Sequence, residues 1–246
     1  EYFVNVDVVL AKQDGLLNKG HIVAQEQLSM PFLVTDNRPA TTSALNYEIV
    51  NDTLLFSGKD FEIKIDQKSG LVSSVNYGGS EFLKAPVRPE FWRAPVYNDL
   101  EIGTYESSFS VWQHLGRNTE LTHLKTTRVN ASYVRVEAEL ALKAIESRYF
   151  VTYHIFGSGE VQVDNWFYAA PHKKYGELPR IGKMFELDTS YNNISYYGRG
   201  PHENYDDRKS SAFVGLYETN VDDMYVPYVR PSENGYRTGV RHVSFT

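Results

Sequence analysis

The chain has 246 residues, of which 41% are hydrophobic and 23% charged, and its 25 basic and 31 acidic residues give a formal net charge of -6. These values are typical of a globular protein that can bury a core, and the acidic balance argues against nucleic acid as a partner, because phosphate binding needs a basic face. Cysteine is absent, which excludes disulfides and thiolate metal sites, and no stretch approaches the roughly 20 apolar residues that would predict a membrane partner.

The N-terminal segment predicts a β-hairpin. Residues 2–8 alternate between apolar and polar side chains, and residues 21–28 read as the partner strand after the turn-rich stretch 11–20. One face of the first strand carries three valines: Val4, Val6 and Val8. The following stretch, 35–44, is polar, contains Pro39 and shows no periodicity, so a boundary between two units is expected there.

The rest of the chain predicts an antiparallel meander of strands. Alternating segments separated by turns cover residues 61–65, 71–75, 133–142, 149–156, 161–168, 181–187 and 194–197. One helix is predicted, with Ser107 or Ser108 as its N-terminal cap and Gly116 as its end, because Phe109, Trp112 and Leu115 follow a helical spacing. The predicted fold class is all-β, a large antiparallel β-sandwich.

The first polar motif is RPEFWRAPVYNDL, residues 88–100. Pro89 and Pro95 argue against a central strand or a regular helix in this segment. A tryptophan face beside amide and carboxylate groups is also a common way to bind a sugar, so the candidate residues are Trp92, Arg93, Asn98 and Asp99. Two interpretations stay open: a proline-stiffened crossover whose tryptophan fills the core, which is favoured, and direct ligand contact.

The second motif is GRGPHENYDDRKSS, residues 198–211, with the candidates His202, Glu203, Asn204 and Arg208. His202 and Glu203 could act as an acid/base pair. Neighbours in an extended segment point to opposite faces, however, so they would not share one proton path. A buried or interfacial hydrogen-bond network is therefore favoured over catalysis.

The third motif covers residues 222–245 and predicts a stiff loop that turns at Asn234-Gly235 and enters a final strand, Thr238 to Phe245. Asp222 and Asp223 are not part of a calcium-loop pattern, so no metal site is expected. The seven histidines show no helical zinc spacing, and no serine lies in a nucleophile-elbow motif.

Four ordered motifs carry a resemblance to a known family: EFWRAPVYND, LPRIG, GRGPHENYDDR and DMYVPYVRPSENGYRTGVR. Together they resemble the C-terminal region of large bacterial glycoside hydrolase family 2 β-galactosidases, and GHIVAQEQ is similar to the closing strand of the immunoglobulin-like domain before the last domain. The resemblance implies the end of that domain at 1–34, a linker at 35–45, and at 46–246 a galactose-mutarotase-like supersandwich that is truncated at its C-terminus.

In this family the two catalytic glutamates and most magnesium and sodium ligands belong to a (β/α)₈ barrel earlier in the polypeptide. The resemblance therefore implies a non-catalytic C-terminal portion of a retaining β-galactosidase acting on terminal β-D-galactosides, which shapes the active-site entrance and subunit packing. No catalytic residue, metal ligand or cofactor is expected in this chain, whereas the full-length protein is expected to bind magnesium and sodium.

The expected partners are the upstream barrel of the same polypeptide, the galactoside substrate in the full-length protein, and further copies in a homo-oligomer. The alternative is an independent carbohydrate-binding or aldose-epimerase-like module, in which His154, His202 or Glu203 would have acid/base roles, and a third interpretation is a purely structural interaction domain. Localisation stays open between the bacterial cytoplasm and the periplasm.

Overall fold

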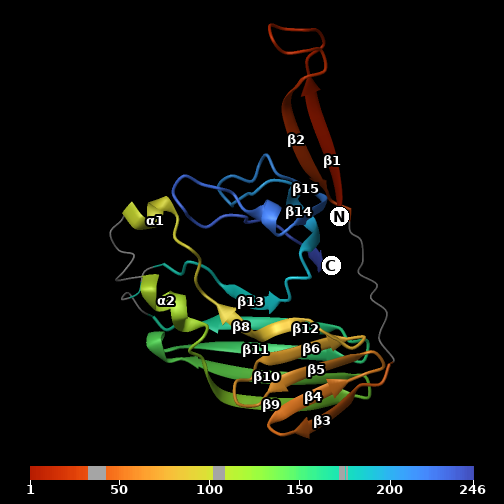
Figure 1. The fold of residues 1–246 in the computed structure, drawn as a ribbon, viewed down its shortest axis with the longest axis vertical. Helices are drawn as coiled ribbons and strands as arrows, with labels where there is room; N and C mark the ends of the chain where they lie inside the picture. Colours follow the sequence, from red (N-terminus) through yellow and green to blue (C-terminus); the bar gives the residue numbers. More distant parts are fainter. Residues whose placement is uncertain (33–42, 102–108, 172–174, 176) are drawn as a thin grey trace. The chain divides into compact units, whose positions relative to one another are not determined.

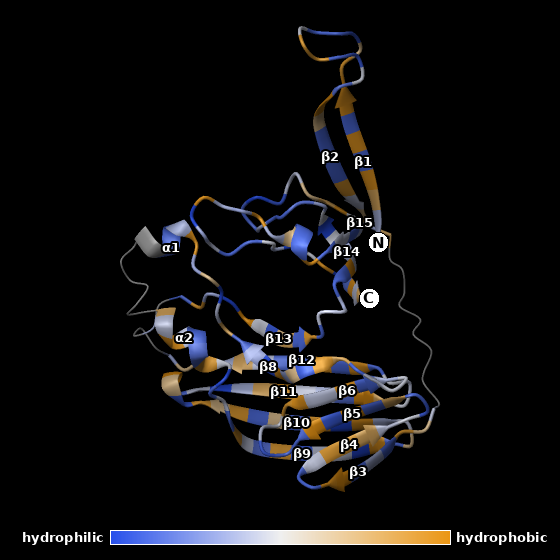
Figure 2. Cartoon of the chain, in the orientation of Figure 1, coloured by the Kyte–Doolittle hydropathy of each residue, from blue (hydrophilic) through white to orange (hydrophobic). Residues whose placement is uncertain are grey.

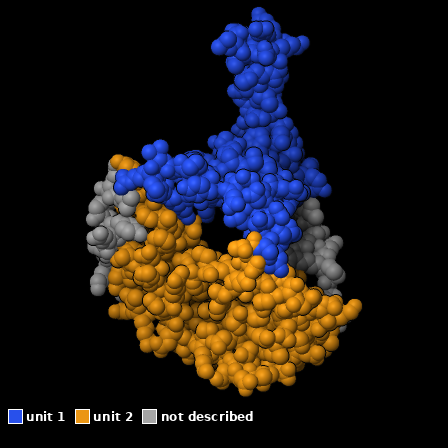
Figure 3. All heavy atoms as spheres, viewed as in Figure 1, with its two compact units in different colours: residues 1–38, 190–246 blue, residues 39–189 orange. Residues whose placement is uncertain are grey.

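The computed structural model describes residues 1–32, 43–101, 109–171, 175 and 177–246. The chain forms two compact units, coloured separately in Figure 3: unit 1 comprises Glu1–Arg38 and Ser190–Thr246, and unit 2 comprises Pro39–Thr189. The regular structure is mostly antiparallel β with few helices, which confirms that part of the predicted fold class. The family domain boundaries at 34 and 45 stay a prediction.

Unit 2 is built from three antiparallel sheets (Figure 1). Its strands are β3 (Asn46–Val50), β4 (Thr53–Ser57), β5 (Phe61–Asp66), β6 (Val72–Tyr77), β7 (Ser80–Glu81), β8 (Leu83–Glu90), β9 (Glu120–Asn130), β10 (Tyr133–Leu142), β11 (Ser147–Phe156), β12 (Val161–Tyr168) and β13 (Gly182–Leu187). Strands β3 to β7 form one sheet and β9 to β12 a second, each in sequence order, while β8 pairs with the distant β13. The two larger sheets are therefore meanders, as the turn spacing predicted.

The two larger sheets bury side chains in one hydrophobic core. Every second residue of β10 is buried, from Val134 to Leu142, and β5 buries Phe61, Ile63 and Ile65 in the same cluster. Figure 2 shows the corresponding alternation of apolar and polar bands along the strands. Because each fully buried aliphatic side chain stabilises the folded state by about 1.5–3 kcal/mol, this shared core is the main source of stability in unit 2.

The predicted helix is present as α2 (Ser110–Leu115), which buries Trp112 and Leu115. The predicted caps, Ser107 and Ser108, lie outside the described residues. Two further short elements of unit 2 were not predicted: α1 (Tyr97–Glu101) and the 3₁₀ turn η2 (Lys143–Ile145).

Gly116 follows α2, as predicted, but for a different reason. Its φ of -67° is available to any residue, so no left-handed conformation requires glycine. A Cβ atom at this position would instead lie 2.0 Å from the carbonyl oxygen of Pro89. Glycine is therefore needed because the end of α2 approaches the backbone of β8 closely.

The prolines were expected to exclude a central strand and a regular helix from residues 88–100, and the expectation about the helix was wrong. Strand β8 continues through Pro89 to Glu90, and α1 begins at Tyr97, two residues after Pro95. Among the strands that the structure describes, β8 hydrogen-bonds only to β13, so it is an edge strand, where a missing N–H donor is tolerated.

Unit 1 combines a hairpin with a three-stranded sheet. Its elements are β1 (Tyr2–Val9), β2 (Ile22–Met30), β14 (Asn193–Gly200), β15 (Phe213–Asn220), the 3₁₀ turn η3 (Asp222–Met224) and β16 (His242–Phe245). Strand β14 lies between β15 and β16. It continues past the predicted Ile194–Tyr197 and includes Gly198 and Gly200, so the first three residues of the second motif belong to a central strand.

The β1–β2 hairpin has the predicted pairing, with Tyr2 opposite Met30 and Val8 opposite Ala24. Three valines of β1 are exposed: Val4 by 43%, Val6 by 46% and Val8 by 53%. The side-chain amide of Gln27 binds the backbone of Val214 in both directions, donating to its carbonyl at 2.9 Å and accepting from its N–H at 2.7 Å. This amide pair joins the hairpin to β15.

The final strand is shorter than predicted, because β16 begins at His242 and not at Thr238. Gly239 has φ +58°, which interrupts an extended conformation, and Thr238 binds the side chain of Asn204. Among the helices that the structure describes, none is long and apolar enough to cross a membrane.

Candidate functional site

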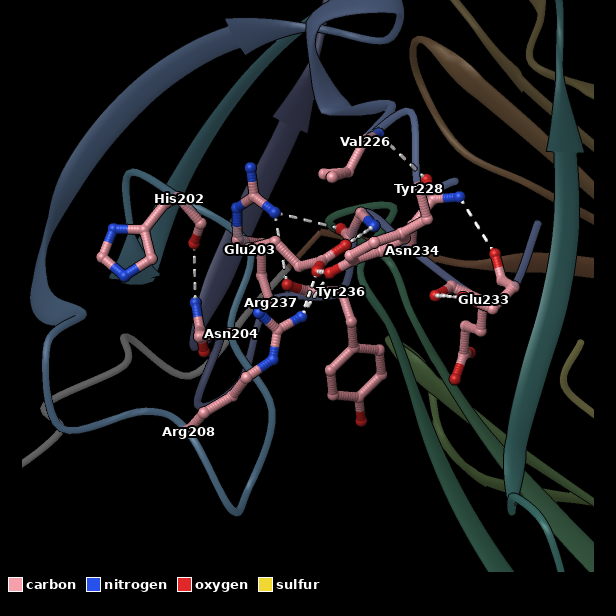
Figure 4. A network of polar contacts seen from close by, with 12 residues as sticks. His202, Glu203, Asn204, Arg208, Val226, Tyr228, Glu233, Asn234, Tyr236 and Arg237 are labelled. Carbon is pink, nitrogen blue, oxygen red and sulfur yellow. Dashed lines mark hydrogen bonds and ion pairs between the residues drawn. The ribbon is translucent and has the colours of Figure 1, made fainter. Parts of the chain in front are cut away.

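Glu203 is at the centre of a polar network in unit 1 (Figure 4). Its side chain is only 5% exposed. One carboxylate oxygen accepts hydrogen bonds from Arg208 and from the Tyr228 hydroxyl, and the other accepts from the backbone N–H of Gly235 at 2.5 Å. The carboxylate therefore has three donors, which come from the second and the third motif.

Aromatic rings surround this ion pair. The Arg208 guanidinium lies 4.9 Å from the centre of the Tyr205 ring, which stacks on Tyr236 at 5.2 Å. The hydrogen bond to Glu203 raises the pKa of Tyr228, while burial, together with the Glu203 charge, raises the pKa of Tyr205 to about 12. Both phenols therefore stay protonated at neutral pH, and Tyr228 remains a hydrogen-bond donor.

Asn204 links the same two motifs through its amide. It is fully buried, and its Nδ2 donates to the carbonyls of Arg199 at 3.1 Å and His202 at 3.0 Å. Its Oδ1 accepts from the N–H of Thr238 at 2.9 Å and from the Thr238 hydroxyl at 2.5 Å. An amide with this many partners holds two loops in one arrangement and has little capacity left for a ligand.

His202 and Glu203 do not contact each other through their side chains. The His202 ring is exposed and its Nε2 pairs with the Ser211 hydroxyl at 3.0 Å, and Figure 4 shows it directed away from the Glu203 carboxylate. His154, the other histidine considered for acid/base chemistry, belongs to unit 2 and bonds Tyr133 and Asp164.

The first motif is braced by a bidentate ion pair in unit 2. Arg93 donates to the two carboxylate oxygens of Asp99 at 2.6 and 3.1 Å, and the N–H of Val96 donates to the same carboxylate at 2.8 Å. Burial by itself would raise the pKa of Asp99, but the hydrogen bonds from Arg93 and Val96 outweigh it and hold the pKa below its usual value. The pair fixes the segment between β8 and α1.

Trp92 and Arg93 line a pocket of about 320 Å³ in unit 2. Trp92 is half-buried against the core, and its backbone N–H donates to Glu90 at 3.3 Å. The lining also includes His114 and three further arginines, Arg88, Arg117 and Arg180. Asn98 is exposed and Asp99 lies behind Arg93, and neither lines the pocket.

The structure thus brings together the candidates of each motif within its own unit: Trp92, Arg93 and Asp99 in unit 2, and Glu203, Asn204 and Arg208 in unit 1. Sequence reasoning missed the partners Tyr228, Gly235 and Thr238, although it had selected their motif separately. It also missed the four-arginine pocket, because these arginines come from three separate segments. In the part of the chain that the structure describes, no group of three acidic or histidine side chains could hold a metal ion.

The fold and the two sites define a mostly antiparallel β protein whose polar motifs fix its loops. The beta galactosidase small chain family matches residues 57–246, and the chain belongs to this family. It is 31% identical over its whole length to a beta-galactosidase of Priestia megaterium, 31% identical over 98% to one of Psychromonas ingrahamii, and 30% identical over 99% to one of Vibrio cholerae. The chain spans about a quarter of the length of these relatives.

Proposed function

We propose that this chain is the non-catalytic C-terminal portion of a retaining β-galactosidase that hydrolyses terminal β-D-galactosides. The observation that carries the proposal is that the whole chain matches proteins named beta-galactosidase while spanning about a quarter of their length. Retaining hydrolysis needs two carboxyl groups about 5–5.5 Å apart. The buried carboxylate Glu203 accepts three hydrogen bonds, which suits a brace better than a nucleophile or a general acid.

The same proposal includes an assignment of the two parts of the chain to particular β folds. Residues 46–246 would form a galactose-mutarotase-like supersandwich, and the shared core of the two larger sheets of unit 2 supports this. Residues 1–34 would close an immunoglobulin-like domain. The exposed valines of β1 support it, because a two-stranded hairpin is marginally stable alone and needs further polypeptide against its apolar face.

In this proposal the chain shapes the entrance to the active site. The Arg93–Asp99 pair holds the segment that contains Trp92 and Asn98, our candidates for the substrate side. The Glu203 and Asn204 contacts hold the loops of unit 1. Loops held by buried polar networks keep one shape, as a neighbouring catalytic site requires.

The proposed partners are the upstream barrel, the galactoside and further copies in a homo-oligomer, in the cytoplasm or periplasm of a bacterium. Magnesium and sodium would bind to the barrel. The residues described in this chain do not fit a metal site, since they include no cluster of three suitable ligands.

The test uses the full-length protein that contains this chain. We expect hydrolysis of a chromogenic β-galactoside, with the β-anomer as the first product in a proton NMR time course. Trp92→Ala should raise KM more than it lowers kcat, because substrate binding and not the chemical step is affected. Trp166→Ala is the matched control, since Trp166 is 71% exposed on β12 and does not line the Trp92 pocket.

An α-anomer as the first product would reject the retaining mechanism. Equal KM values for both variants and the parent protein would remove Trp92 from the substrate side. If the 246-residue chain alone bound galactose saturably or accelerated its mutarotation, the carbohydrate-binding or epimerase-like alternative would replace our proposal.

A further inference from the structure

The pocket beside Trp92 has an unusual charge. It is formed by the end of β8, by α2 and the residue after Gly116, and by the segment that enters β13. Four arginines line it, Arg88, Arg93, Arg117 and Arg180, against one carboxylate, Glu90. This cationic lining contrasts with the chain as a whole, whose net charge is -6.

Part of this positive charge is compensated within the protein. Arg88 pairs with Glu90 at 3.0 Å and lies 4.0 Å from Glu186, and Arg93 pairs with Asp99. These two guanidiniums are held in place by their carboxylates, and Arg93 also donates to the carbonyl of Ala94 at 3.3 Å. Arg88 and Arg93 are therefore positively charged groups with fixed positions in the lining.

Arg117 also lines the pocket, but its charge is not compensated in the same way. Its backbone is fixed at the end of α2, where its N–H donates to the carbonyl of His114 at 3.1 Å. Its side chain is exposed and forms no ion pair with a residue that the structure describes. A cleft that combines fixed guanidiniums with an uncompensated one attracts anions, because walls of low dielectric focus the field.

We propose that this pocket binds a small ligand that carries an oxyanion, such as a carboxylate or sulfate group, on a body of monosaccharide size. Guanidinium groups match oxyanions by paired hydrogen bonds. The volume of about 320 Å³ is at the lower end of ligand pockets, roughly 300–1,000 Å³, and Trp92 and Met184 add apolar wall. The proposed galactoside substrate is uncharged, so the oxyanion ligand is a different ligand, and the inference does not depend on the proposed function.

The test is isothermal titration calorimetry on the full-length protein, in the absence and in the presence of excess neutral galactose. The probes are D-galacturonate, galactose 6-sulfate and sodium sulfate. We expect saturable binding of the charged sugars that weakens as sodium chloride is raised. Arg117→Gln should weaken it about tenfold, the effect of one charge-assisted hydrogen bond. Arg148→Gln, which removes another exposed arginine of unit 2, should leave it unchanged.

Three results would overturn the proposal: no saturable binding of any of the oxyanions, equal effects of the two arginine variants, or equal heats when a second neutral sugar replaces the charged ones. Sulfate that binds as tightly as the charged sugars would support the oxyanion site and identify the free ion as its ligand. Because binding is measured directly, a protein without galactosidase activity would still give a decisive answer.

Discussion

Glu203 is the residue on which the loop structure of unit 1 depends most. Glu203→Ala removes the acceptor of three hydrogen bonds, from Arg208, Tyr228 and the Gly235 N–H. We expect the free energy of unfolding to fall by about 2–4 kcal/mol, measured by urea denaturation. Asp206→Ala is the control, because the Asp206 side chain is 86% exposed and its surface ion pair should contribute less than about 1 kcal/mol. Equal losses would show that the network does not hold the loops.

Lys183 is a second residue of interest, because its buried amino group should make the stability of the protein depend on pH. Its Nζ is buried without a hydrogen-bond partner among the described residues, 5.5 Å from the Tyr149 ring and 5.4 Å from the Tyr153 ring. Burial lowers its pKa to about 8. Between pH 8 and the ordinary lysine pKa of about 10.4, the unfolded chain binds more protons than the folded one, so Lys183 makes stability rise with pH in that window.

Lys183→Met should therefore flatten the pH dependence of stability between about pH 8 and 10, and increase stability at pH 7, where the buried ammonium is costly. The measurement is the urea midpoint at several pH values. Lys125→Met, at an exposed lysine of β9, controls for the loss of one positive charge. An unchanged slope in Lys183→Met would mean that the ammonium is solvated.

At the scale of elements, the contact between the end of α2 and β8 leaves no room for a larger residue than glycine. Gly116→Ala would place a Cβ atom 2.0 Å from the Pro89 carbonyl oxygen, whereas Gly182→Ala, on β13, would meet no atom within 4 Å. We expect Gly116→Ala to destabilise unit 2 by more than about 2 kcal/mol, and Gly182→Ala to change stability by less than about 1 kcal/mol. Thermal unfolding of both variants measures this, and similar melting temperatures would contradict it.

Elements with one buried face were predictable from the sequence, and others were not. Strands β5 and β10 alternate strictly because one face is buried in the core, which is the source of the period-two signal. Strand β9 was missed, since its 11 residues are exposed or half-exposed and none is buried. The end of β14 was also missed, because glycines suggest a loop although Gly198 and Gly200 continue the strand.

The candidate sites were predictable only as separate motifs. The density of polar groups selected Glu203, Asn204 and Arg208, and local composition selected the segment of Arg93 and Asp99. What composition could not show is which distant segments meet: Tyr228 and Gly235 reach Glu203 only because the chain returns after β15. Hydrogen-bond partners far apart in sequence are a property of the fold, and a single sequence does not display them.

At the scale of the whole molecule, one unit interrupts the other along the sequence. Residues 39–189 form unit 2, and the two segments of unit 1 precede and follow them. A boundary was predicted in the polar stretch after the hairpin, but no pattern in the sequence indicated that residues 190–246 would join residues 1–38 in one unit. The connection depends on single contacts such as Gln27 with Val214 and Arg241 with Glu1, the latter at 2.8 Å. Single contacts of this kind produce no repeating pattern in the sequence.

The pairing of Gln27 with Val214 also sets an order of events during synthesis. Unit 2 is one continuous segment, whereas the hairpin, which precedes it in this chain, can bind the Val214 backbone only after β15 has been made. The entropic cost of closing the loop between the hairpin and β15 grows only slowly with its length. If unit 2 has already folded, the unfolded part of this loop is shorter. Within this chain the hairpin is therefore synthesised before unit 2 but reaches its neighbour β15 only after it.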